Sequence, residues 1–179
     1  VGMDALIDMG GDKVADVAAA LGQEHFDSLG GDTVSNMVSA MNMENFQSIG
    51  GDQTVTMIET VGLDAVIDMG SDKVADVAAA MDKDNFQALG ADHVMEMAVV
   101  MDAQNLSSLG DSAAAGIIET LTGDQLGTLK SDQLAGLAAS LEPATAATLG
   151  ADQVGSMVSN MEASAISNVD GAVMGGMMA

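Results

Sequence analysis

A period of 20 residues, kept without insertion or deletion, constrains the fold of this chain more than any other feature of its sequence. Residues 61–92 nearly repeat residues 1–32, and shorter units within both segments recur every 20 residues. Eight of these units, which we call blocks, fill residues 11–170, and block positions are counted from 1 at Gly11 to 20 at Gly30. A fixed period of this length is typical of stacked repeat proteins.

The pattern continues as half repeats at both ends of the chain. Residues 1–10 match the second half of a block, and residues 171–179 match the first half. No linker interrupts the pattern, so we expect one domain, a single repeat array over residues 1–179. The spacing of 60 residues between the two best-matched segments reflects either three blocks per superhelical turn or a duplication of three blocks.

Each block is predicted to contain two short helices. Positions 4, 7, 8 and 11 are mostly apolar, which is the spacing of one face of an α-helix and not of a strand. Positions 16 and 19 carry the apolar residues of a second, shorter helix. Ten helical residues span only about 15 Å and are marginally stable alone in water, so they must stack on neighbouring blocks. The sequence predicts an all-α fold, an α-solenoid of 20-residue helix-turn-helix repeats.

Aspartate fills position 2 of every block except the one with Ser112. An Asp just before the apolar residues of a helix is a good N-cap, because its carboxylate accepts a bond from a free first-turn N–H group. The same column could instead form a carboxylate ladder that binds Ca²⁺ weakly, although no compact calcium loop is present. Both interpretations stay open for this column, which comprises Asp12, Asp32, Asp52, Asp72, Asp92, Asp132 and Asp152. We expect no other metal and no cofactor.

Two further signals mark the ends of the second helix. Position 12 or its neighbour is usually Asp, Asn, Thr or Glu, which suits the start of a helix. Position 20 is Gly in most blocks, and we expect it to take the left-handed conformation that closes a helix.

Charge restricts the possible partners. The chain has 27 acidic and 4 basic residues, for a net charge of −23, so it cannot neutralise the phosphates of nucleic acid or an anionic membrane surface. We expect neither nucleic acid binding nor membrane insertion. An acidic excess suits an extracellular setting. No set of nucleophile and base interrupts the repeat, so we do not expect an enzyme.

The two ends of the chain are predicted to self-associate. Stable repeat arrays usually end in polar caps, but both ends here carry apolar residues. These residues are Val1, Met3, Leu6 and Ile7 at one end and Val173, Met174, Met177 and Met178 at the other. A head-to-tail contact that does not close on itself produces a filament, so we expect a homopolymer or homo-oligomer. The alternative is that the chain is a piece of a longer array.

Residues 121–137, LTGDQLGTLKSDQLAGL, contain a ten-residue half-repeat of the form L-x-x-D-Q-L-x-x-L. This segment resembles the short tandem helical repeats of the L-T-x-[DE]-Q type in large secreted or surface-attached bacterial proteins. The resemblance implies a structural role outside the cell or at its surface, and it carries over no functional residues.

We therefore predict a structural protein, an acidic α-solenoid that stacks end to end into a filament or forms part of a long adhesin-like array. The alternative is a binding module whose solenoid surface holds a protein partner or divalent cations. A third hypothesis, a copper carrier, rests on Met174, Met177 and Met178, because thioethers are soft ligands and these methionines lie outside the core pattern. Most of the methionines sit at positions 7, 11 and 19 and are expected to fill the core.

Overall fold

The structure is a computed structural model that describes residues 3–178, with side chains from Ala5 onward. Within this range every regular element is a helix and no strand is present, as the apolar spacing predicts. Contacts between residues group the chain into two compact units, Val1–Met81 and Asp82–Ala179.

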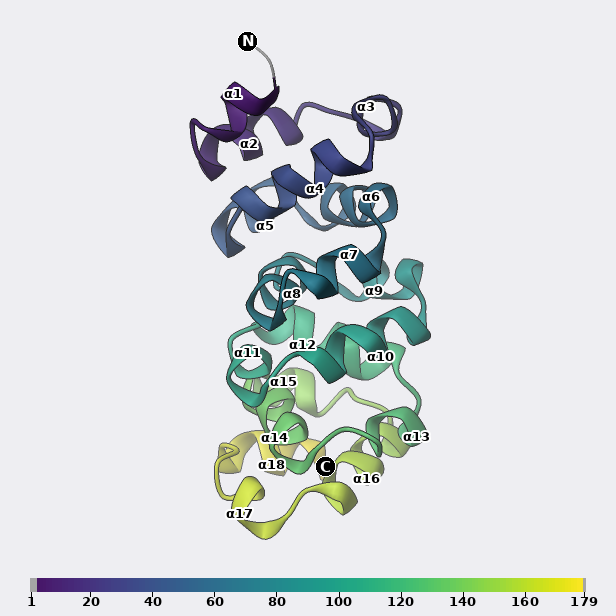
Figure 1. The fold of residues 1–179 in the computed structure, drawn as a ribbon. Coiled ribbons are helices and arrows are strands. Elements are labelled where there is room, and N and C mark those ends of the chain that lie inside the picture. The colour runs from purple at the N-terminus through teal and green to yellow at the C-terminus, as the bar shows by residue number, and fades with distance from the viewer. Residues whose placement is uncertain (1–2, 179) are drawn as a thin grey trace. The chain divides into compact units, whose positions relative to one another are not determined.

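The first unit contains eight helices among its described residues (Figure 1). Each longer helix begins at block position 1 and each shorter helix at position 13, which confirms the two helices predicted for a block. The helices are α1 (Met3–Ile7), α2 (Gly11–Ala18), α3 (Gln23–Leu29), α4 (Gly31–Ala40), α5 (Met43–Ile49), α6 (Gly51–Val61), α7 (Leu63–Asp68) and α8 (Ser71–Ala78).

The second unit continues the same alternation through its described part, residues 82–178. Its shorter helices contract towards the C-terminus, from seven residues in α9 to four in α17. The helices are α9 (Lys83–Leu89), α10 (Ala91–Val100), α11 (Ala103–Ser107), α12 (Asp111–Thr120), α13 (Gly123–Leu126), α14 (Ser131–Ala139), α15 (Pro143–Ala146), α16 (Ala151–Asn160), α17 (Ala163–Ile166) and α18 (Gly171–Met177).

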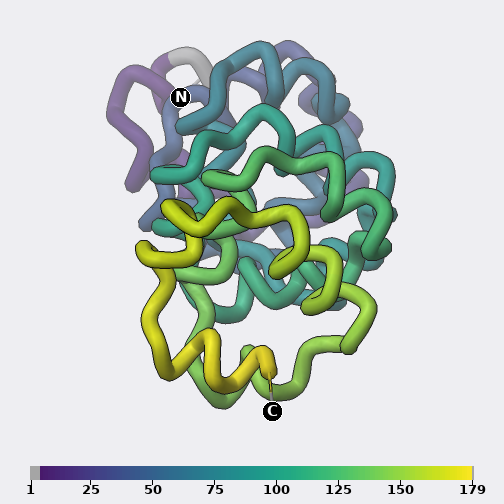
Figure 2. Tube along the Cα trace, turned by 90° about the horizontal axis from the view of Figure 1, so that it is seen from below, coloured from purple at the N-terminus to yellow at the C-terminus, as the bar shows by residue number. Residues whose placement is uncertain are grey.

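Helices three apart in the chain pack on each other within each unit. In the first unit α1 lies against α4, α2 against α5, and α5 against α8. In the second unit α9 lies against α12, α11 against α14, and α15 against α18. Figure 2 shows α16, α17 and α18 following one another round a circuit, and α18 comes back to lie against α15. Because longer and shorter helices alternate, each such pair joins a longer helix to a shorter one.

Methionine and phenylalanine fill the interior of both units. The largest fully buried side chains include Phe26, Phe46 and Phe86 at position 16, and methionines at positions 7 and 11. Those methionines are Met37, Met41, Met57, Met81, Met97 and Met101. Their burial confirms the prediction that most methionines pack the core, where an unbranched side chain fills irregular gaps.

A single glycine separates the second helix of a block from the next helix at several corners. Gly30, Gly50 and Gly90 have φ of 78°, 86° and 87° with ψ of 156°, 165° and 152°. The positive φ agrees with the prediction, but ψ lies in an extended region and not in the left-handed helical one. That combination is accessible essentially only to glycine. Lys130 occupies the same block position, before α14, with φ −68°, so glycine is not required there.

Candidate functional site

The column of aspartates lies two residues further into the helices than the sequence predicts. In the seven longer helices that carry these aspartates, the N-cap residues are Gly10, Gly30, Gly50, Gly70, Gly90, Lys130 and Gly150, and none makes a side-chain cap. The aspartates occupy the second helical residue and are exposed. The N-cap interpretation is therefore wrong for them, because the helix already begins at position 1. Their charges still lie in the first turn, where the helix dipole favours an anion.

Side-chain caps occur instead at the start of the shorter helices, as the residues at position 12 predict. The Asn42, Asp82 and Asp102 side chains accept hydrogen bonds from the N–H groups of the residues three further on, at 3.0, 3.1 and 2.8 Å. The side chains of those third residues accept in turn from the cap N–H groups. This reciprocal arrangement is a capping box, which satisfies two N–H groups that the helix itself leaves free.

Long polar side chains at position 3 connect helices that are far apart in sequence. The Gln53 amide donates to the carbonyl of Ala18 at 2.9 Å and also to that of Leu21. Gln133 donates to the carbonyl of Met101, 32 residues earlier, at 2.7 Å. In the first unit the Lys73 ammonium donates to the carbonyl of Met41, again 32 residues earlier. Position 3 therefore caps the C-terminal carbonyls of an earlier longer helix, a role that the sequence analysis missed.

Position 1 makes the equivalent contact in the other direction along the chain. The Asp111 carboxylate accepts hydrogen bonds from the Glu142 N–H and the Thr145 hydroxyl, both at 2.6 Å. The Ser131 hydroxyl accepts from the Glu162 N–H at 2.7 Å. Position 1 therefore holds the start of the shorter helix that lies three helices further on.

Position 6 sits against the first residue of the shorter helix three helices earlier. A Cβ atom added at Gly136 would lie 2.5 Å from the carbonyl oxygen of Ala103, and one added at Gly176 would lie 2.5 Å from that of Pro143. Ser156 donates its hydroxyl to the carbonyl of Gly123, 33 residues earlier, at 2.5 Å. Small residues at this position allow the two backbones to approach.

One partly buried charged cluster occurs in the first unit. The Lys73 ammonium lies 3.6 Å from the Asp76 carboxylate and 5.8 Å from the ring centroid of Phe46. Burial raises the pKa of the Asp76 carboxyl above its usual value, although Lys73 and the Met43 N–H act in the opposite direction. The cluster fixes α8 on the C-terminal end of α4 and on α5.

The structure divides the predicted assembly residues at the C-terminal end into two pairs. Val173 and Met177 are buried, so they are core residues and the prediction is wrong for them. Met174 is half-buried and Met178 is 69% exposed. Val173 and Met177 occupy positions 3 and 7, on the side of the helix that faces α15, whereas Met174 and Met178 occupy positions 4 and 8.

The N-terminal assembly residues are only partly described. Val1 lies outside the described residues, and so does the side chain of Met3. Leu6 and Ile7 are half-buried in α1.

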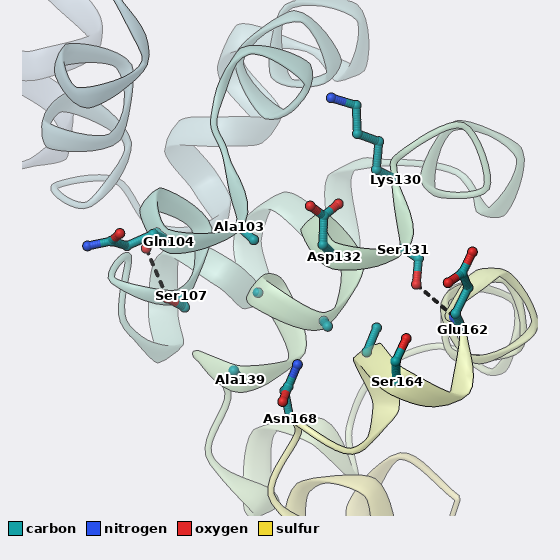
Figure 3. Close-up of a pocket in the computed structure, with 13 residues that line it drawn as sticks. Ala103, Gln104, Ser107, Lys130, Ser131, Asp132, Ala139, Glu162, Ser164 and Asn168 are labelled. Carbon is teal, nitrogen blue, oxygen red and sulfur yellow. Dashed lines mark hydrogen bonds between the residues drawn. The ribbon is translucent and has the colours of Figure 1, made fainter.

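A groove of about 750 Å³ crosses α11, α14 and α17 in the second unit (Figure 3). Its walls are small residues such as Ala135, Gly136 and Ala165, with few charged groups. Figure 3 shows Lys130 extending away from Ser164 and Asn168. Three charged residues, Lys130, Asp132 and Glu162, also line the groove.

Residues 3–178, as far as their side chains are described, contain no group of three or more His, Asp or Glu side chains that could hold a metal ion. Weak Ca²⁺ binding along the exposed aspartates stays a prediction. Among the same residues, none of the helices combines the length and apolar content needed to span a bilayer. Comparison of the chain with family models, with curated proteins and with solved structures gives no match.

Proposed function

We propose that the chain is a structural repeat protein, an acidic α-solenoid that forms a segment of an extracellular or cell-surface filament or adhesin-like array. In this proposal the helices of both units follow one continuous coil with three helices in each turn. The net charge of −23 and the half-repeat LTGDQLGTLKSDQLAGL support the extracellular setting.

The observation that carries the proposal is that residues at the same block position make equivalent hydrogen bonds in both units. Position 3 donates to the carbonyl 32 residues earlier at Lys73 in the first unit and at Gln133 in the second. A contact that recurs at one sequence separation is what a coil with a constant rise per turn requires, because equivalent residues in successive turns then have equivalent neighbours.

A coil with three helices per turn also explains the 60-residue spacing in the sequence. The helices alternate between longer and shorter with a period of two, and they pack with a period of three. Six helices, or three blocks, are the shortest length after which both periods recur. Residues 1–32 and 61–92 would then occupy equivalent environments two turns apart, which favours similar sequences.

Distances between spin labels test the solenoid, because the chain has no cysteine and single labels are easily introduced. Asp32, Asp92 and Asp152 are exposed, equivalent and 60 residues apart. With two turns of roughly 9 Å each, labelled cysteines at residues 32 and 92, and at 92 and 152, should lie on the order of 20 Å apart. The pair at 32 and 152 should lie about twice as far apart. Unequal short distances, or a long distance well below their sum, would refute a single coil.

The groove across α11, α14 and α17 favours one alternative, a binding module for a protein partner. Its small side chains suit an apolar peptide segment, and Asp132 and Glu162 in its lining suit basic flanks on that peptide. Chemical shift mapping with such a peptide should then give shifts at Ala135 and Ala165, and Ala139→Glu at the rim should weaken them. If millimolar peptide causes no chemical shift change at these residues, the binding-module alternative is refuted.

A further inference from the structure

We propose that the groove across α11, α14 and α17 binds a partner polypeptide through one arginine side chain. The guanidinium pairs with the Asp132 carboxylate, and the aliphatic stem lies on the groove floor, which we define as Ala135, Gly136 and Ala165. This inference rests on the binding-module alternative and specifies the chemistry of the partner. It is compatible with a structural array, which would carry the partner on its surface.

The side chains of the groove itself, and not the ends of the chain, keep it open. Its rim includes Glu162, Ser164 and Asn168 at positions 12, 14 and 18, and these three positions are exposed in all eight blocks. On the floor, Ala135 and Ala165 are buried. Because the same rim positions are exposed in blocks far from either end, the opening is a property of the repeat.

In the first unit, a longer side chain fills the place that Ala165 leaves empty. Asn45, at position 15 of α5, is buried, and its amide donates to the Asp12 carboxylate of α2 at 2.8 Å. The equivalent residues of α17 and α14, which also pack on each other, are Ala165 and Asp132. Alanine has no donor, so the Asp132 carboxylate lacks the amide that Asp12 binds. Within the described residues it accepts from the N–H of Gln133 at 3.0 Å, and a carboxylate can accept about four hydrogen bonds.

A second place that is filled in the first unit lies at the C-terminal end of the longer helix. There the Gln47 amide of α5 donates to the carbonyl of Ala79, just after α8, at 3.4 Å. The equivalent residues in the groove are Ser107 and Ala139. The Ser107 hydroxyl donates to a carbonyl of its own helix at 2.9 Å. Pro143, four residues after Ala139, has no N–H to donate to the Ala139 carbonyl. The groove therefore offers an acceptor at each end of α14 where the first unit supplies its own donors.

These two acceptors require an occupant that brings N–H groups, and the local charge favours a cationic one. Asp132 and Glu162 both line the groove, and the chain carries a net charge of −23. Figure 3 shows the two carboxylates on the same side of the groove, away from Asn168. A guanidinium has five N–H donors in a planar fork that matches a carboxylate, and it is more weakly hydrated than an ammonium group. Arginine therefore fits Asp132 better than lysine does.

The shape of the groove suits the rest of a short peptide. Its floor has no polar side chain, since Gly136 stands where the equivalent helix α8 has Asp76. A volume of about 750 Å³ exceeds that of one arginine side chain and leaves room for the main chain beside it. Positions 2 and 9 of a helix are about 10 Å apart, which is the length of about three residues of extended peptide. A main-chain N–H of the peptide could therefore reach the Ala139 carbonyl while the arginine binds Asp132.

Lys130 is the one basic residue among those that line the groove, and it opposes a cationic occupant. Its side chain is exposed, and Figure 3 shows it extending away from Ser164 and Asn168. Repulsion between exposed charges is screened within about 8 Å at an ionic strength of 0.15 M. Lys130→Ala should therefore tighten the binding of an arginine peptide at low salt, and the gain should shrink as NaCl is added.

Titration of the ¹⁵N-labelled chain with the blocked peptide acetyl-LARALA-amide, up to 5 mM at pH 7 and 0.05 M NaCl, tests the proposal. The amide shifts should be concentrated at Asp132, Ala135, Ala139 and Ala165. The same peptide with citrulline, which keeps the shape of arginine but is neutral, should bind about fivefold more weakly or worse. Asp132→Asn should raise the Kd of the arginine peptide by about the same factor. Asp152→Asn removes the same charge at the same block position of α16, outside the groove, and should change the Kd less than about twofold.

A substitution that restores the side chain of the first unit provides an independent test. Ala165→Asn places an amide where Asn45 donates to Asp12, so it should bond to Asp132 and occupy the groove. This variant should lose binding of the arginine peptide and should have a higher urea midpoint than the parent chain. A variant that keeps the parent Kd would refute the equivalence between this groove and the filled site of the first unit.

The outcomes separate this inference from the functions proposed above. If the citrulline peptide binds as tightly as the arginine peptide, the pairing of arginine with Asp132 is overturned, whereas the binding-module alternative stands. Shifts spread over the exposed aspartates of both units, with equal effects of Asp132→Asn and Asp152→Asn, would mean unspecific attraction to the acidic surface and would also overturn it. If neither peptide shifts any groove residue at 5 mM, the inference and the binding-module alternative both fail. The spin-label distances do not depend on peptide binding, so the solenoid is judged separately.

Discussion

Replacing Gly136 by alanine tests the close packing of α14 on α11. The added Cβ atom would lie 2.5 Å from the carbonyl oxygen of Ala103, 3.2 Å from its Cα and 3.2 Å from the Cβ of Leu106. Two of these three atoms belong to the backbone, so no side-chain rotation relieves the contact. An ordinary contact needs roughly 3.4 Å or more, and α11 must therefore move away from α14 by several tenths of an ångström or more.

Two opposing effects set the change in the free energy of unfolding that Gly136→Ala causes. Alanine is favoured over glycine in a helix by about 1 kcal/mol. Overpacking a close interface costs about 1–3 kcal/mol. The close approach of these two backbones puts Gly136 at the upper end of that range. We expect Gly136→Ala to lower the free energy of unfolding by about 1–2 kcal/mol. Gly155 lies in the next longer helix with nothing within 4 Å of an added Cβ, so Gly155→Ala should raise the free energy of unfolding by about 0.5–1 kcal/mol.

Urea denaturation followed by circular dichroism at 222 nm measures both variants, because the chain lacks tryptophan and tyrosine. The two substitutions are chemically identical, so their difference of about 1.5–3 kcal/mol reports only the surroundings of each glycine. If Gly136→Ala is as stable as the parent chain or more stable, the close approach of α14 to α11 is refuted. A loss of stability in Gly155→Ala would refute the open space around that residue.

Three other substitutions test separate parts of the fold. Gly50→Ala places a side chain at φ 86° with nothing within 4 Å, so it should cost about 1–3 kcal/mol through backbone strain alone, as thermal unfolding will show. Lys73→Ala removes the cap on Met41 and leaves Asp76 half-buried, which should cost about 1–2 kcal/mol in urea, whereas Lys13→Ala should stay within about 0.5 kcal/mol of the parent chain. Burial raises the folded-state pKa of Asp76, so its deprotonation opposes folding and its contribution to stability is lost as pH rises through that pKa. Asp76→Asn should therefore be more stable than the parent chain at pH 7, and the difference should shrink as pH falls through the raised pKa and be gone below 3.8, the usual value; a constant difference across pH would contradict this reasoning.

Local features of the fold were accessible from the sequence. The apolar residues at positions 4, 7, 8 and 11 fixed the longer helix, because a helix needs one continuous face to bury. Position 12 marked the start of the shorter helix, where Asn42 and Asp82 cap it as predicted. The aspartates of position 2 were misplaced, because a glycine with a positive φ can start a helix without a side-chain cap, as Gly50 does.

The contacts between distant helices needed the tertiary structure. Gln53 and Gln133 gave no local signal of the carbonyls they would bind, since those carbonyls lie 32 residues earlier. The small residues Gly136 and Gly176 were a signal that the sequence analysis did not use. Their meaning depends on which backbone approaches them, and a 20-residue period alone does not reveal that helices pack three apart.

The identical segments at residues 13–16 and 73–76 distinguish what the sequence determines from what the tertiary structure determines. The sequence by itself determined that both segments form the first turns of a longer helix, with Val14 and Val74 buried at position 4. Only the tertiary structure decided that Lys73 caps an earlier helix while Lys13 remains exposed. The physical reason is that helix formation depends on residues a few places apart, whereas burial depends on whether another turn of the chain lies alongside.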